Sequence, residues 1–420
     1  MPQWRWFVAQ IAKRIWFRAA LIGILSVLLA LAANLLAPLI PYEFAKLGDG
    51  AVGTVLTVLA SSMLAVTTFS LTAMVTAFSG ASQSGTPRAT ELLVEDAVAQ
   101  NALSTFLGAF LFSIVGIIAL QANYYGPQAR AILLVGSVFV IFAIAVTLLR
   151  WIAQLTHFGR VSDTIDRLEK KARDALGRYD GPMVLSGHAD RSAPDDAPIT
   201  VWSPLAGYVA HIDRGKLADL AEQCGSPVHL SAPAGVFVDR ARPLAWVAEG
   251  IDDREECETL EEKISRSFTI ARQRDFDQDP RFGVTVLGEV ASRALSPAVN
   301  DPGTAIAVLS AGMRVFDDFL DTYADSAEGS DRSFEGLVEP ALSLEEMVED
   351  LVLPIARDGA GLAEVGIRLQ HVLGSLAKRA GTARDAYERL ADEALDRATA
   401  ALSHEPDRRR VREAHESAFG

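Results

Sequence analysis

Four long stretches of the chain contain no charged residue, and each is rich in apolar side chains. They run over Ala19–Tyr42, Ala51–Pro87, Ala97–Ala129 and Ala131–Leu149. An α-helix needs about 20 apolar residues to cross the hydrocarbon core of a bilayer. The pattern therefore predicts four transmembrane helices, at about residues 19–40, 54–79, 102–122 and 131–152.

The second apolar stretch differs from the others because small and hydroxylated residues recur along it every three or four positions. The series consists of Ala65 and seven hydroxylated residues. The hydroxylated residues are candidates for lining a pore: Thr54, Thr57, Ser61, Thr68, Thr72, Thr76 and Ser79. Residues at this spacing share one face of a helix, so the side chains form a continuous stripe. Two interpretations stay open: the stripe packs against another helix, or it lines a hydrated path in an oligomer.

The pattern changes after the fourth apolar stretch. Apolar residues at helical spacing predict a helix over 158–178, and a run rich in Gly, Pro, Ser and Asp then predicts a linker. Short β-type runs split by Pro and Gly follow, and the remainder is mainly helical. We expect four regions: a four-helix transmembrane domain at 1–157, a connecting helix and linker at 158–198, a small β-rich module at 199–252 and a mainly helical cytoplasmic domain at 253–420.

The β-rich module contains the run "SPLAGYVAHID", then a predicted helix and the run "APAGVFVDRARPLAWV". This arrangement is similar to barrel-sandwich hybrids such as biotinyl and lipoyl domains and membrane-fusion adaptors, and the similarity implies a β-barrel-like module. Lys216 falls in the helix instead of an exposed hairpin, so we expect no attached cofactor. The predicted fold class is thus a membrane α-helical protein with four transmembrane helices, plus a cytoplasmic α+β domain with a small β-barrel-like module and a helical C-terminal part.

Charge is divided unevenly along the 420 residues. The first 160 hold 9 Lys and Arg and 5 Asp and Glu, for a net charge of +4, whereas the remaining 260 have a net charge of −18. Basic residues precede the first span and follow the last, so the positive-inside rule predicts four crossings with both termini in the cytoplasm. The acidic second part argues against a nucleic-acid partner. No predicted span has a charged residue at its centre, which argues against a proton relay or an ion-coupled transporter.

Two helices in the second part are predicted to begin with the same dipeptide, at Asp279–Pro280 and Asp301–Pro302. Asp is a favoured N-cap residue, and Pro suits the first helical turn. We name Arg272–Ala305 the signature segment. Its runs "FDQDPRFG" and "ASRALSPAVNDPGTA" resemble a bacterial family of predicted membrane proteins, catalogued as domain of unknown function 2254. The resemblance covers essentially the whole chain and implies four membrane helices followed by a cytoplasmic domain, in the bacterial inner membrane.

Polar residues of the signature segment lie near the two predicted helix starts. As candidates for a ligand or subunit contact we take Arg272, Arg274, Asp277, Asp279, Arg293, Ser296, Asn300 and Asp301. Helix N-termini attract anions, but here the two Asp side chains are expected to occupy the free N–H groups. A pair of capped helices joined by a loop with Arg–Asp bonds is therefore the alternative to a binding site.

No phosphate-binding loop, zinc motif or nucleophile with its base and orienting group is recognisable, so we expect no metal and no cofactor. A membrane hydrolase or transferase stays open only as a third hypothesis, after the two that follow. The first functional hypothesis is a homo-oligomeric channel or pore-like protein with a cytoplasmic collar. Its acidic domain would favour cations as the permeant ions. The alternative is a membrane-anchored binding or regulatory protein whose cytoplasmic domain takes a partner or small ligand.

Overall fold

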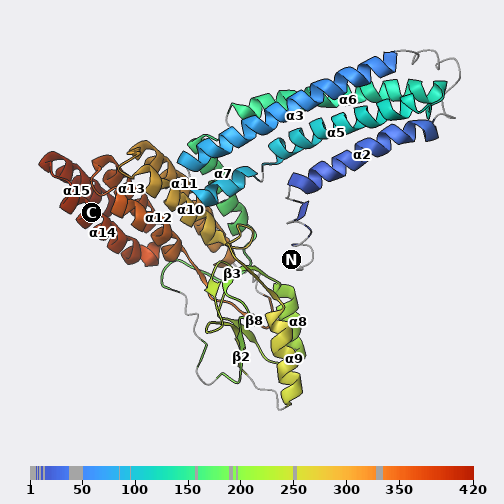
Figure 1. Cartoon of the computed structure of the whole chain (residues 1–420). Coiled ribbons are helices and arrows are strands. Elements are labelled where there is room, and N and C mark those ends of the chain that lie inside the picture. Colours follow the sequence, from blue (N-terminus) through green and yellow to red (C-terminus); the bar gives the residue numbers. More distant parts are fainter. Residues whose placement is uncertain are drawn as a thin grey trace. The chain divides into compact units, whose positions relative to one another are not determined.

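The computed structural model of the chain divides into two compact units (Figure 1). We call them the four-helix unit (Val8–Gln83 and Thr90–Asp163) and the α+β unit (Met1–Phe7, Ser84–Ala89 and Thr164–Gly420). The structure describes residues 6, 8, 11–12, 15–36, 51–84, 86–94, 96–156, 159–188, 193–194, 197–248, 253–327 and 334–420. The predicted end of the first span at residue 40, and part of the predicted linker, lie outside the described residues.

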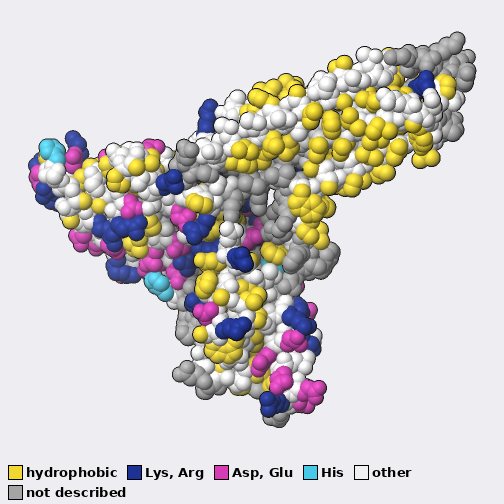
Figure 2. Space-filling model, viewed as in Figure 1, with side chains coloured by type: hydrophobic (Ala, Val, Ile, Leu, Met, Phe, Trp, Pro, Cys, Tyr) yellow, Lys and Arg dark blue, Asp and Glu magenta, His cyan; other side chains and the backbone are white. Residues whose placement is uncertain are grey.

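The four-helix unit contains one long helix for each apolar stretch. These are α2 (Ile15–Leu36), α3 (Ala51–Ser84), α5 (Ala97–Gln121) and α6 (Pro127–Leu155). Each contains a segment of 20 to 30 residues that is long and apolar enough to cross a membrane. Figure 2 shows apolar side chains covering these helices, whereas charged side chains gather on the α+β unit. The prediction of four membrane helices is confirmed.

All four helices begin earlier than hydropathy predicts, at residues 15, 51, 97 and 127. For two of them, local chemistry at the helix start explains the boundary. At α5, the side chain of Asp96 accepts a hydrogen bond from the backbone N–H of Ala99, which caps the helix. At α6, a proline stands in the first turn, where its missing N–H costs nothing. A short helix, α4 (Pro87–Val94), follows α3 and was not predicted.

The β-strands of the α+β unit form three small open sheets. One has the order β2 (Ile199–Trp202), β6 (Pro243–Val247), β4 (Val228–Leu230), β8 (Leu337–Val338), and the next β5 (Phe237–Val238), β3 (Gly207–Ile212), β7 (Phe268–Ala271). The third pairs β1 (Met183–Val184) with β9 (Leu342–Ser343) in parallel. The first two sheets, with α8 (Arg214–Cys224) and α9 (Arg254–Ser265), share an apolar core.

The predicted β-barrel-like module is not supported. Within the described residues, β2 and β8 are the two edges of the four-stranded sheet and do not pair with each other, so the sheet does not close. Two of the strands, β7 and β8, also come from beyond residue 252. The repeated β-type runs between Pro and Gly predicted strands correctly, but such runs carry no information on which strands pair.

The rest of the α+β unit is helical. It contains α7 (Val161–Leu176) from Thr164 onward, α10 (Pro280–Ala294), α11 (Pro302–Ala327), α12 (Leu344–Asp358), α13 (Ala363–Arg379), α14 (Arg384–Ala401) and α15 (Glu405–Phe419). Helix α10 is buried along most of its length and packs against α11 and α12. The two predicted helix starts at Asp279–Pro280 and Asp301–Pro302 are confirmed.

Candidate functional site

The hydroxyl stripe of α3 lies on the outside of the four-helix unit. All its positions are exposed, whereas Leu56, Met63 and Met74, on the opposite face of the helix, are buried. Hydroxyls along the stripe donate hydrogen bonds of 2.8 to 3.0 Å to backbone carbonyls four residues earlier, at Thr57, Ser61, Thr68 and Thr72. Because the helix itself satisfies these hydroxyls, the exposed face suits contact with lipid or with another helix.

The signature segment places its candidate residues at two opposite ends of α10. Arg272, Arg274, Asp277 and Asp279 precede the helix, Arg293 lies in its last turn, and Ser296, Asn300 and Asp301 follow it. A helix of 15 residues is about 22 Å long. The eight residues therefore do not form one site, and the two ends have to be considered separately.

Asp279 is the buried residue at the N-terminal end of α10. Its carboxylate accepts a hydrogen bond of 3.2 Å from the backbone N–H of Phe282 and one of 2.7 Å from the Arg274 Nε. The Arg274 guanidinium also lies over the Phe282 ring, 4.8 Å from its centroid. Burial raises the pKa of the Asp279 carboxyl, and the positive charge of Arg274 opposes this shift.

Gly235 packs directly against the Asp279 carboxylate. Its φ of +88° lies in the left-handed region, which side chains other than glycine rarely adopt. A Cβ atom at this position would also overlap the Asp279 carboxylate oxygen. The loop that contains Gly235 can therefore approach α10 so closely only because it has no side chain there.

A cavity of about 310 Å³ opens beside this carboxylate, wholly within the α+β unit. Three segments line it: the loop Pro233–Phe237, the start of α10, and the segment from Pro340 into α12. Additional lining residues are Tyr179, Arg214, Arg242, Arg274 and Gln278. Its volume is at the lower end of the range of about 300 to 1,000 Å³ that is typical of small-molecule sites.

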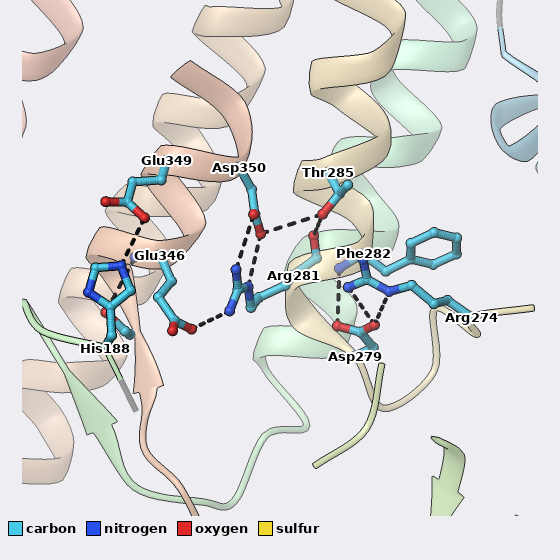
Figure 3. A network of polar contacts seen from close by, with 10 residues as sticks. His188, Arg274, Asp279, Arg281, Phe282, Thr285, Glu346, Glu349 and Asp350 are labelled. Carbon is cyan, nitrogen blue, oxygen red and sulfur yellow. Dashed lines mark hydrogen bonds and ion pairs between the residues drawn. The ribbon is translucent and has the colours of Figure 1, made fainter. Parts of the chain in front are cut away.

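Arg281, on the first turn of α10, is held in the cavity wall by carboxylates of α12 (Figure 3). Its Nε and Nη2 donate to the two carboxylate oxygens of Asp350 at 2.9 and 3.1 Å, and its Nη1 donates to Glu346. Thr285, one turn along α10, donates to Asp350 at 3.5 Å. This bidentate arrangement fixes the orientation of the guanidinium plane.

The charges that line the cavity are mostly paired. Arg214 donates to Glu339 at 2.7 Å, Arg274 to Asp279, and Arg281 to both acids of α12. Arg242 is different, because the one hydrogen bond of its guanidinium among the described residues goes to the backbone carbonyl of Phe237, at 3.4 Å. The cavity therefore offers one guanidinium without a carboxylate partner in the part of the chain that the structure describes.

The C-terminal end of α10 forms a tight turn into α11. The Ser296 hydroxyl donates to the carbonyl of Arg293 at 2.7 Å, and Asn300 has a left-handed φ of +51°. Asp301 accepts from the backbone N–H and the hydroxyl of Thr304, at 3.2 and 2.6 Å. These bonds lower the pKa of the Asp301 carboxyl. This end is a pair of linked caps, and the cavity beside Asp279 does not extend to it.

The described residues contain no group of three or more His, Cys, Asp or Glu side chains that could hold a metal ion. Among the described residues that line the cavity there is no Ser, Cys or Lys, and the Thr285 hydroxyl is bonded to the carbonyl of Arg281 at 2.9 Å and to Asp350. What the arrangement offers chemically is binding: guanidinium and amide donors, carboxylate acceptors and an apolar loop around a small volume.

Comparison with known proteins identifies the family. The model of a family described as "Predicted membrane protein (DUF2254)" matches residues 12–375. The chain belongs to this family. The resemblance expected from the signature segment is thereby confirmed for this DUF2254 protein.

Two mycobacterial proteins are similar to part of this DUF2254 chain. Uncharacterized protein Mb1321c of Mycobacterium bovis and uncharacterized protein Rv1290c of Mycobacterium tuberculosis are each 28% identical to it over 231 residues. The matched region covers 51% of this chain and 42% of each relative. The chain thus matches less than half the length of these curated relatives. No solved structure matches it.

The sequence of this DUF2254 protein did not point to several residues that build the cavity. These are Arg242, Arg281, Thr285, Glu346 and Asp350. A weak signal was present for the last two, because they stand four residues apart and so share one face of α12. Nothing in the sequence indicates that this face meets α10.

Proposed function

We propose that this DUF2254 protein is a membrane-anchored binding protein whose α+β unit takes a small polar ligand in the cavity at the start of α10. The observation that carries the proposal is the cavity itself. It is lined by charged side chains held in fixed orientations, such as Arg281 between Glu346 and Asp350. In small-molecule sites, a small number of precisely placed polar groups fixes the orientation of the ligand.

The charges of the cavity indicate the kind of ligand. Arg242 has no carboxylate partner among the described residues, so it is available to an anionic group. The carboxylates of Glu346 and Asp350 can accept hydrogen bonds from a donor on the same ligand. A small molecule that combines an anionic group with N–H or O–H donors, such as an amino acid or a nucleotide, fits both features.

The membrane topology expected from the sequence indicates which ligands could reach this site. Basic residues before the first span and after the last one favour a cytoplasmic location for both termini in a bacterial inner membrane. The cavity would then face the cytoplasm, and its ligand would be a cytoplasmic metabolite.

A thermal-shift experiment on the purified full-length protein tests the proposal. The probes are the proteinogenic amino acids and the common nucleoside mono- and diphosphates, each at millimolar concentration. A ligand at about 100 times its Kd stabilises a protein by about 2.7 kcal/mol, so we expect a rise in Tm of about 5 °C for at least one probe.

Matched tryptophan variants locate the effect. Ala234→Trp fills the cavity without changing a charge, and Ala401→Trp adds the same side chain at the exposed end of α14. We expect the shift to survive in Ala401→Trp and to vanish in Ala234→Trp. No shift with any probe, or an equal shift in both variants, would contradict the proposal.

An oligomeric channel is the second candidate, and the α3 stripe is the observation that favours it. The stripe is exposed along its whole length and faces away from the core of its own unit. In a homo-oligomer, α3 from each copy could surround a common axis and present these hydroxyls to a hydrated path. The net charge of −18 beyond residue 160 would favour cations at its cytoplasmic mouth.

A further inference from the structure

One end of the β-sheets in the α+β unit gathers exposed apolar side chains. Between residues 164 and 420, the large apolar side chains that are exposed among the described residues are Trp202, Leu205, Phe237, Val299 and Val338. The first three are 50%, 59% and 47% exposed, respectively, and all three lie at this end. Large apolar residues scattered singly need no explanation, but a cluster on one surface indicates a contact.

Strand pairing brings these residues together. Trp202 is the register partner of Pro243, and Gly207 is the partner of Val238. The loop 203–206 connects Trp202 to Gly207, and the loop 239–242 connects their partners, Val238 and Pro243. The two loops therefore lie side by side. Leu205 is in the first loop, and Phe237 directly precedes the paired Val238. We call this end of the sheets the Trp202 tip.

Two exposed arginines flank the tip. Arg240 is in the second loop, and Arg272 follows Ala271, which pairs with Tyr208 next to Gly207. Neither guanidinium has a hydrogen-bond or ion-pair partner in the part of the chain that the structure describes. Most other arginines of this unit are paired, as Arg214 is with Glu339. The acid within the two loops is Asp239, whose carboxylate accepts from the backbone N–H of Ala241 at 2.8 Å.

We propose that the Trp202 tip docks on the surface of a lipid bilayer that contains anionic headgroups. Trp, Phe and Leu side chains are favoured at the membrane interface, where an apolar body meets a polar boundary. Unpaired arginines beside them gain attraction from acidic lipids. The combination is an apolar and basic surface on a part of the chain whose net charge is strongly negative.

A bilayer fits this tip better than a soluble acidic partner. The chain is anchored in a membrane by its four helices, so the tip is always tethered near lipid at a high effective concentration. An acidic protein segment, such as helix α9 of a second copy with Glu255, Glu256 and Glu258, would satisfy the charge. It would leave Trp202 and Leu205 without an apolar partner.

Lipid-attached quenchers test this docking on the full chain. In a Cys224→Ser and Cys257→Ser background, Ala206→Cys in the tip carries an NBD fluorophore, and Ala401→Cys carries it in a control protein. The quencher is a doxyl-labelled phosphatidylcholine, placed in the host bilayer in one arm and in added protein-free vesicles in the other. We expect quenching at residue 206, in at least one arm, when phosphatidylglycerol is present, and none at residue 401.

Charge reversal provides the decisive comparison. Each arginine near an anionic surface contributes about a fivefold change in affinity, so Arg240→Glu with Arg272→Glu should abolish the quenching. Arg254→Glu, on the exposed face of α9, changes charge away from the tip and should retain it. Quenching that is absent in both arms, unchanged by the double reversal, or equal in pure phosphatidylcholine would overturn the proposal. So would a signal that depends on protein density alone, because it would indicate contact between copies.

This inference does not rest on the proposed ligand site, although the tip and the cavity share Phe237 and the loop 239–242. Arg242 and Phe237 line the cavity and stay unchanged in every variant of the docking experiment. A protein that binds a ligand but shows no lipid quenching would overturn the docking proposal alone.

Discussion

At the residue scale, Gly235 is the position where backbone conformation and site chemistry are most directly linked. Gly187 has a similar left-handed φ, +94°, but a Cβ atom there would meet no atom within 4 Å. Gly187→Ala therefore costs only backbone strain, about 1 to 2 kcal/mol. Gly235→Ala adds an overlap with the buried Asp279 carboxylate.

We expect Gly235→Ala to lower the Tm of the full-length protein clearly more than Gly187→Ala does. It should also displace the loop that lines the cavity and so weaken ligand-induced stabilisation. Equal effects of the two substitutions on Tm would show that the close contact between Gly235 and Asp279 is not formed.

The hydrogen-bonded carboxylate of Asp301 leads to a prediction about how stability depends on pH. Hydrogen bonds from Thr304 lower its pKa in the folded protein below the ordinary value of 3.8. Its contribution to stability is therefore complete above about pH 4 and is lost as the pH falls through the folded pKa. Asp301→Asn lacks this contribution at every pH.

The Tm difference between the wild type and Asp301→Asn should consequently be constant from pH 7 to 5 and shrink below pH 4. Asp219→Asn, on the exposed side of α8, is the control for the loss of one carboxylate. A difference that grows on acidification would contradict the hydrogen-bonded turn at Asp301.

Residue chemistry was predictable where it is local. Asp279 and Asp301 were expected to cap helices, and both do. The bond between Arg281 and Asp350 joins residues that are 69 positions apart. No local pattern encodes such a pair, so the cavity could not be found from the sequence.

At the element scale, local features were again predictable from the sequence and long-range pairings were not. The apolar stretches and the 3.6-residue periodicity predicted the membrane helices and the later helices, because each signal lies within one segment. The sheets depend on pairs such as β4 with β8 and β1 with β9, which join distant segments in parallel. The expectation of a barrel was therefore wrong in topology although most of its strands exist.

Helix α3 provides the prediction at this scale. If its stripe lines a path in an oligomer, Thr68→Leu with Thr72→Leu should abolish or strongly reduce current through the purified protein in planar bilayers. Ser62→Leu, exposed on α3 but off the stripe, should leave the current unchanged. No current in the wild type, or equal currents in all three proteins, would leave the stripe as a surface for lipid or helix packing.

At the scale of the whole molecule, charge and hydropathy separate into two units. The division at residue 160 between a first part of net charge +4 and a second part of −18 was visible in the sequence. It lies close to the boundary between the two units at residue 163, although Met1–Phe7 and Ser84–Ala89 also belong to the α+β unit. The folded α+β unit shows where its charges converge, at the cavity beside α10. It also shows two guanidinium groups, of Arg240 and Arg272, that have no partner among the described residues.

The central claim is that the cavity binds a small polar ligand. Its most direct test is a cryo-EM structure of the full-length protein in a lipid nanodisc, with the amino acid or nucleotide that raises Tm most. The account predicts density for that probe in the cavity, with its anionic group beside Arg242 and a donor beside Glu346 or Asp350. An empty cavity, with the probe bound elsewhere on the molecule, would contradict it.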